Sequence, residues 1–158
     1  MADNDRRDLV AQMKNRALVY LEMFDVLVEE LGEQKAEELL TRAIYRRGRA
    51  MGKSFAKFAP ADLNGLKEAF LGSVPGGTGI FQPEVKKEEA GTLEIQLHGC
   101  PLKDAWREAG LPEQKVETLC RIAGAVDKGL FEGAGFRFEN RTWAPGATGC
   151  CFLHIARG

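Results

Sequence analysis

Sulfur atoms from three parts of the chain are the side chains best suited to chemistry. Cys100 precedes Pro101, Cys120 follows in a later segment, and Cys150 and Cys151 are adjacent near the C-terminus. A thiolate is both a nucleophile and a soft metal ligand, so these residues indicate covalent catalysis or metal binding. Packing as a small apolar side chain is the commoner role of a lone cysteine. A functional role therefore requires that separate segments bring the thiols together.

Cys100 stands where a predicted strand changes into a predicted helix. Residues 92–98 alternate between apolar and polar, and residues 101–109 have helical spacing with Pro101 at the first position, where its missing N–H costs nothing. We expect Cys100 at the N-cap, where the helix dipole and free backbone N–H groups favour a thiolate. This position makes Cys100 a candidate nucleophile or metal ligand.

A carboxylate shares a helical face with the second cysteine. Cys120, Gly124 and Asp127 are spaced four and then three residues apart within a predicted helix over residues 112–133, so they lie on one side of it. Asp127 stands among apolar residues, where a carboxylate needs a partner or a function. Asp127 is therefore a candidate general base or water-orienting residue. The alternative is a structural helix with one small buried thiol and one exposed carboxylate.

The last predicted strand, residues 150–156, places cysteines on both of its faces. Cys150, Phe152 and His154 point to one side, and Cys151 points to the other. A thiol and an imidazole are both zinc ligands, but the compact Cys-x-x-Cys signature is absent, so a zinc site would need tertiary convergence. The candidate zinc ligands are Cys100, Cys120, Cys150 and His154.

Three other residues are candidates for contact with a small molecule. Arg141, in a predicted strand over residues 136–143, could hold a carboxylate through two parallel hydrogen bonds or could be solvated. Trp106 is expected to pack its helix, with stacking on a ligand as the alternative. His98 ends the strand before Cys100, although a lone histidine is more often structural.

The segment Gly48 to Ser54 resembles a phosphate-binding loop. It is one residue short of the motif and lies inside a helical run rather than between a strand and a helix. We therefore predict a solvated helix with small residues there, and only a turn in the glycine-rich stretch 76–79.

The segments that position these side chains predict an α+β fold. The elements expected in chain order are helices over 3–31, 33–58 and 61–71, a hairpin over 80–98, helices over 101–109 and 112–133, and a second hairpin over 136–156. This order predicts one domain over residues 1–158, with N-terminal helices in 1–71. The part 78–158 would hold an antiparallel sheet of two hairpins, two intervening helices and the site.

Composition restricts the class of partner. The 158 residues are 44% hydrophobic and 28% charged with a formal net charge of -1, so neither nucleic acid nor an anionic membrane is an expected partner. No apolar run approaches the ~20 residues of a membrane helix. The polar N-terminus does not resemble a signal peptide, so we expect free thiols and a cytoplasmic location. The amphipathic N-terminal helices could pack on each other or form a homodimer.

The pattern of cysteines and aspartate resembles a known family. The matching residues, all within 93–156, are Cys100-Pro-Leu, Ala105-Trp106, Gly110-Leu111, Cys120, Asp127, Thr142, Gly146, Cys150 and Phe152. They resemble the L-2-amino-thiazoline-4-carboxylate hydrolase-like family, and the tail is also similar to four-vinyl-reductase-type small-molecule-binding domains. The family cysteine falls on Cys150, which keeps the Cys-x-Phe spacing, with Cys151 as the alternative.

The resemblance implies a hydrolase that opens a cyclic C–N bond in a small thiazoline derived from an amino acid. Cys100 would act as nucleophile or metal ligand, Asp127 as base, and Arg141 as a carboxylate-binding residue. A non-catalytic sensor that binds a small molecule or a metal is the alternative, because one fold hosts many functions. A third possibility is that the cysteines only pack and the helices mediate dimerisation.

Overall fold

Two long helices form the N-terminal third of the computed structural model, which describes residues 2–158. Helix α1 (Asp3–Leu31) ends at Gly32, whose φ of 83° lets the chain reverse into α2 (Glu33–Gly52). A short 3-10 helix, η1 (Lys53–Phe58), follows directly. The predicted helix over 33–58 is therefore confirmed in extent, although its last turns are more tightly wound than an α-helix.

The rest of the chain contains four further α-helices and the four strands of one sheet. These elements are α3 (Leu63–Ser73), α4 (Thr78–Phe81), β1 (Pro83–Glu89), β2 (Thr92–Leu97), α5 (Pro101–Glu108), α6 (Glu113–Gly133), β3 (Arg137–Arg141) and β4 (Phe152–Ala156). Asp62 caps α3 by accepting a hydrogen bond from the Gly65 N–H at 2.9 Å. The strand expected to begin at residue 80 begins at Pro83, because residues 78–81 form a helical turn that ends at Gln82 in the left-handed region.

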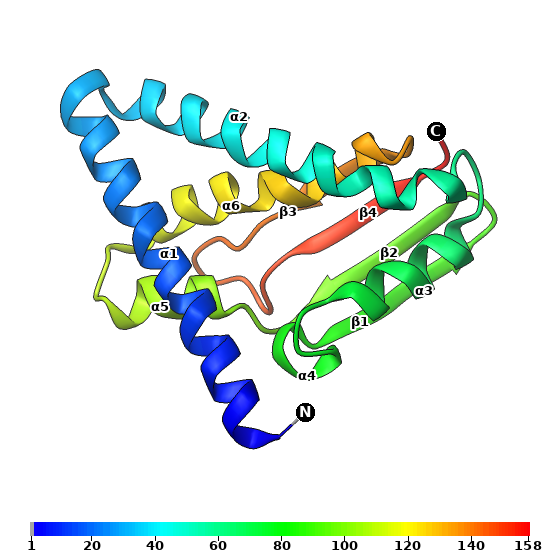
Figure 1. The fold of residues 1–158 in the computed structure, drawn as a ribbon. Coiled ribbons are helices and arrows are strands. Elements are labelled where there is room, and N and C mark those ends of the chain that lie inside the picture. The colour runs from blue at the N-terminus through cyan, green and yellow to red at the C-terminus, as the bar shows by residue number, and fades with distance from the viewer. Residues whose placement is uncertain (1) are drawn as a thin grey trace.

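The sheet confirms the predicted α+β class. All its pairs are antiparallel, in the order β1-β2-β4-β3, so the two predicted hairpins are joined through β2 and β4. In the central pair Ile95 faces Leu153, and both are fully buried. Their face of the sheet packs against Leu66 of α3 and Phe131 of α6. The opposite face carries partly exposed side chains, among them Glu94, Gln96 and His154. Helix α3 runs alongside β1 and β2, and α2 runs beside α6 (Figure 1).

Helices α2 and α6 approach each other backbone to backbone. A Cβ atom added at Gly48 would overlap the carbonyl group of Val126, and one added at Gly52 or Gly129 would overlap a carbonyl of the opposite helix in the same way. One added at Gly133 would come within 2.9 Å of Arg49. Any larger side chain would push the two helices apart. The predicted solvated helix is therefore wrong for Gly48 and Gly52, which are buried in this contact.

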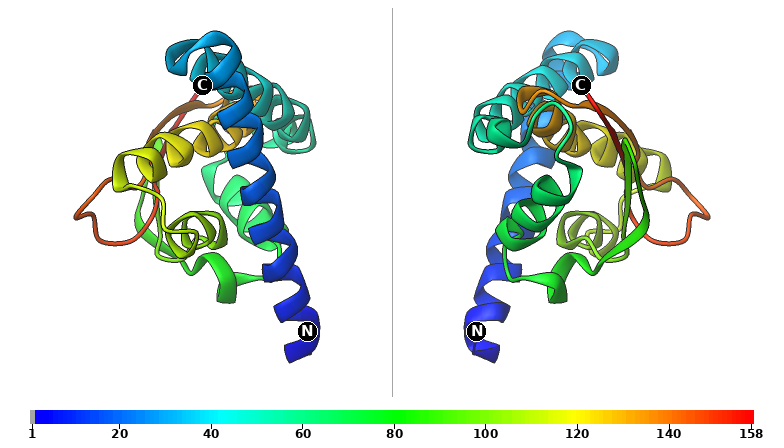
Figure 2. Two further views of the ribbon diagram at one scale, coloured as in Figure 1. Left: turned by 90° about the vertical axis from the view of Figure 1, so that its left-hand side faces the viewer. Right: turned by 90° about the vertical axis from the view of Figure 1, so that its right-hand side faces the viewer.

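Helix α6 belongs to both apolar cores of the molecule. One core joins it to α1, α2 and α5, and the other joins it to α3 and the sheet. The β3–β4 connection projects from the side of the molecule opposite α1 (Figure 2). No helix within residues 2–158 is long and apolar enough to cross a membrane.

Candidate functional site

Two cysteines meet at the end of the sheet. Cys100 has an extended backbone at the N-cap of α5 with Pro101 following it, as predicted. The backbone N–H of Cys150 donates to the Leu97 carbonyl at 2.8 Å, which ties the end of the β3–β4 connection to the end of β2. The side chains of Cys100 and Cys150 are consequently close enough for each to shift the pKa of the other. Pairing of β2 with β4 therefore creates the thiol pair.

Lys103 is a candidate site residue that the sequence did not single out. It follows Cys100 by three residues, so it lies on the same side of α5. Its Nζ donates to Cys150 Sγ at 3.3 Å, and its side chain is only 11% exposed. Burial is the largest single influence and lowers the pKa of Lys103, but the charge of Cys150, the hydrogen bond to it and the charge of Asp104 together outweigh burial, so the net pKa is raised. A buried cation therefore lies against the sulfur of Cys150.

Of the two thiols, Cys150 is the one that is more readily deprotonated to a thiolate. The hydrogen bond from Cys100 lowers the pKa of Cys150 to about 7, with Lys103 assisting and burial opposing. The same hydrogen bond, together with burial, raises the pKa of Cys100 well above its ordinary value. As a thiol, Cys150 can instead donate to the His98 carbonyl at 3.7 Å. The predicted thiolate at the N-cap is therefore not favoured.

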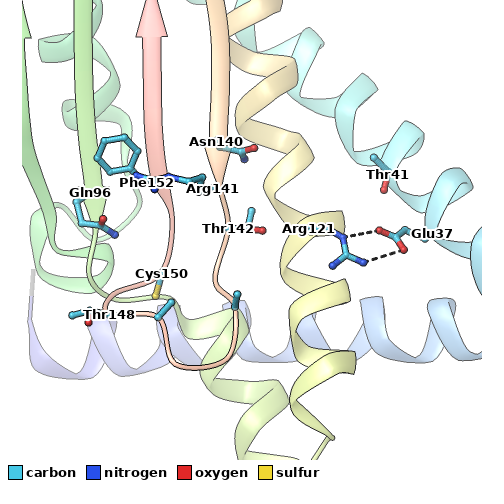
Figure 3. A pocket seen from close by; sticks show the side chains of 12 residues that line it. Glu37, Thr41, Gln96, Arg121, Asn140, Arg141, Thr142, Thr148, Cys150 and Phe152 are labelled. Atoms are coloured by element: carbon cyan, nitrogen blue, oxygen red, sulfur yellow. Dashed lines mark hydrogen bonds and ion pairs between the residues drawn. The ribbon is translucent and has the colours of Figure 1, made fainter.

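Cys150 lines a cleft of about 780 Å³ between the sheet and helices α2 and α6 (Figure 3). Strand register places Gln96, Phe152 and Arg141 in one row across three strands beside it. The Arg141 guanidinium lies 4.8 Å from the Phe152 ring centroid, an arrangement typical of a cation–π contact. The far wall carries Arg121, paired with Glu37 at 2.9 Å. The lining of the cleft therefore includes two arginines and Cys150, with Arg121 already paired to a carboxylate.

The loop that carries Cys150 is anchored at both ends. At its start, a Cβ atom at Gly124 would come within 2.6 Å of Thr142, so only glycine lets the chain pass this close to α6. At its end, Gln96 Nε2 donates to the carbonyls of Leu97 and Cys151 at 2.9 and 3.1 Å. Between them the indole of Trp143 is buried. These anchors fix the position of Cys150 although it follows an irregular segment.

The other two cysteines, Cys120 and Cys151, and the carboxylate of Asp127 do not line the cleft. Burial, and then the charge of Cys150, raises the pKa of Cys120 to about 12. Burial, and then the charge of Asp127, raises the pKa of Cys151 above its ordinary value. Burial alone raises the pKa of Asp127 to about 7. Among the described residues, the cleft lining includes Cys150 but neither these thiols nor this carboxylate.

The side chains of the remaining predicted site residues have partners other than the thiol pair. The Trp106 indole is fully buried and donates to the Ala17 carbonyl at 2.8 Å, so it packs α5 on α1. His98 pairs with Glu84 at 2.7 Å.

His154 pairs with Glu94 at 3.1 Å on the partly exposed face of the sheet. Across residues 2–158, no group of three or more histidine, cysteine, aspartate or glutamate residues is arranged to hold a metal ion. The four candidate zinc ligands therefore do not gather into one site.

Comparison with known families gives one match. The family model for L-2-amino-thiazoline-4-carboxylic acid hydrolase matches residues 12–154, from within α1 to within β4. No curated protein matches the chain. The matched segment contains Cys100, Lys103 and Cys150 and most of both cores, so the chain belongs to the L-2-amino-thiazoline-4-carboxylic acid hydrolase family.

Proposed function

We propose that the protein hydrolyses a small cyclic substrate of the aminothiazoline carboxylate type, with Cys150 as the nucleophile. The observation that carries this proposal is the Lys103 ammonium 3.3 Å from Cys150 Sγ, beside a cleft that Cys150 lines. A nearby cation and a lowered pKa are the usual means of activating a cysteine nucleophile. Family membership supports this class of substrate.

The reaction divides into two steps. The Cys150 thiolate adds to the ring carbon between sulfur and nitrogen of the protonated amidine, which leaves the ring nitrogen as N–H. The ring C–N single bond of the tetrahedral adduct then breaks as this nitrogen takes a second proton and leaves as an amine, while the exocyclic nitrogen forms a C=N bond to the same carbon. Lys103 is positioned to give that proton, since its ammonium already contacts the attacking sulfur. Water then adds to the same carbon and displaces the Cys150 thiolate, which restores the enzyme. Cys100 holds the thiolate by donating its own S–H.

Arg141 is the residue that we assign to the substrate carboxylate. It lines the cleft together with Cys150, and Phe152 supports its guanidinium. A guanidinium binds a carboxylate through two parallel hydrogen bonds, which would fix the orientation of the ring relative to the sulfur. Lysine at this position would keep the charge but lose the paired geometry.

The test uses the purified full chain and L-2-amino-thiazoline-4-carboxylate, with the ring-opened product measured by mass spectrometry. We expect turnover by the wild type and loss of nearly all of it in Cys150→Ala, because the nucleophile is gone. Cys151→Ala is the matched control, since it removes the neighbouring thiol on the opposite face, and circular dichroism checks the fold of both variants. Activity retained in Cys150→Ala would refute the mechanism. Binding of the compound by the wild type without turnover would instead favour the sensor function.

A further inference from the structure

Large exposed apolar side chains are concentrated on one helix. Among the described residues seven such side chains are exposed, and five of them belong to α1. The five are Leu18, Val19, Met23, Val26 and Leu31. Scattered exposed apolar residues are normal, but a cluster on one element marks a surface that is covered in the working protein.

Three of these residues form a stripe along α1. Val19, Met23 and Val26 are spaced four and then three residues apart, so they share one side of the helix. They are 48%, 48% and 55% exposed. The side that packs in the core carries Ala17 and Phe24, which are buried. Helix α1 therefore has a second apolar side that its own fold does not use.

Helix α1, which carries the stripe, is attached to the rest of the fold by a buried hydrogen bond and an ion pair. The buried side of α1 receives the Trp106 indole hydrogen bond at Ala17, and Lys14 pairs with Glu108 of α5 at 2.7 Å. The views in Figure 2 place α1 on the side of the molecule away from the β3–β4 connection. A partner seated on the stripe would therefore leave the Cys150 cleft accessible.

Opposite charges flank the stripe. Arg16 precedes it and Glu30 follows it on the same side of the helix; both are exposed, and neither forms an ion pair within residues 2–158. Met23 lies midway between them in the sequence. A twofold axis beside Met23 would set Arg16 against Glu30 of the partner subunit, and Val19 against Val26 of the partner subunit. A parallel arrangement would instead place like charges together.

We propose that a second copy of this chain covers the stripe, forming a homodimer through antiparallel α1 helices with the twofold axis beside Met23. Self-complementary apolar and charged residues on one surface are what an isologous dimer requires. The proposal concerns assembly and does not depend on the hydrolase function.

The first test is the mass of the full chain in solution, measured by sedimentation velocity over a wide range of protein concentration. We expect the wild type at about twice the 17.4 kDa chain mass. Val26→Glu should give the monomer, because it buries a charge in the interface. The matched control Val85→Glu, at a 38% exposed position on β1, should leave the dimer intact. A monomeric wild type, or a dimer that survives Val26→Glu, would overturn the proposal.

The second test examines the antiparallel register. Arg16→Glu should weaken the dimer by about tenfold, because two symmetric attractions become repulsions. Combining Arg16→Glu with Glu30→Arg in the same chain should restore wild-type affinity, since both pairs are re-formed with exchanged signs. A double variant no tighter than the single one would contradict this register. Circular dichroism of each variant separates loss of the interface from loss of the fold.

Discussion

Two cysteines from different segments meet at one place, but the pKa of one thiol is raised and that of the other is lowered. Cys100 lies at the junction between β2 and α5, and Cys150 lies at the end of the connection between β3 and β4. Cys100 has the helix N-terminus, which is equivalent to about half a unit charge. Cys150 has no helix of its own, yet it receives the Cys100 hydrogen bond and the Lys103 ammonium at 3.3 Å. Its pKa is lowered, while the pKa of Cys100 is raised. The Lys103 ammonium and the Cys100 thiol therefore favour the thiolate of Cys150 more than the N-terminus of α5 favours the thiolate of Cys100.

The sharpest test of this comparison is the relative reactivity of the two thiols. At neutral pH we expect iodoacetamide to modify Cys150 at least about tenfold faster than Cys100, because the thiolate is the reactive form. The rate at Cys150 should rise with pH and reach half of its plateau near pH 7. Peptide mass mapping of briefly treated protein identifies the modified residue. Faster labelling of Cys100 would reverse the assignment of the nucleophile.

Substitution of Lys103 isolates the contribution of its charge. Lys103→Met should raise the pKa of Cys150 and shift the pH profile of its alkylation to higher pH, with a loss of about tenfold in rate at neutral pH for a change of one unit. Lys103→Arg is the control that retains the cation, and it should keep most of the wild-type profile. The measurement is the alkylation rate as a function of pH. An unchanged profile in Lys103→Met would show that Cys100 alone tunes the thiolate.

The buried carboxyl group of Asp127, outside the lining of the cleft, also has a shifted pKa. Burial raises its pKa from 3.8 to about 7, so the folded state holds a proton that the unfolded chain releases. Stability is therefore lost as the pH rises from about 4 to about 7, and it stays lost above that range. Asp127→Asn should raise the free energy of unfolding at pH 8 by about 2 kcal/mol, below the ~4 kcal/mol limit of the full shift, and leave it nearly unchanged at pH 4.

Urea unfolding at the two pH values measures this effect. The exposed Asp8→Asn serves as the control, because its carboxylate stays in water. Equal stability of Asp127→Asn and wild type at pH 8 would contradict the stated cost of burial. Loss of hydrolysis in a more stable Asp127→Asn protein would support the general-base role predicted from the sequence.

Local sequence determined the elements and one part of the site. Gly32 ends the first helix, Asp62 caps the third, and Cys100 with Pro101 begins the fifth, as expected from backbone preferences. The two hairpins follow from alternating side chains, and the pattern of cysteines and aspartate was sufficient to identify the family. These features are predictable because each depends on residues within a few positions of one another.

Tertiary structure decided which residues can act together. Pairing of β2 with β4 brings Cys150 to Cys100, and this contact selects the thiolate. The need for glycine at Gly48 and Gly52 of α2 becomes clear only from the backbone of α6, which lies too close for a side chain. Lys103 acquires a role only when a loop from the other hairpin reaches it. Charge, burial and close approach depend on neighbours that are distant in the sequence, and periodicity within one segment carries no information about them.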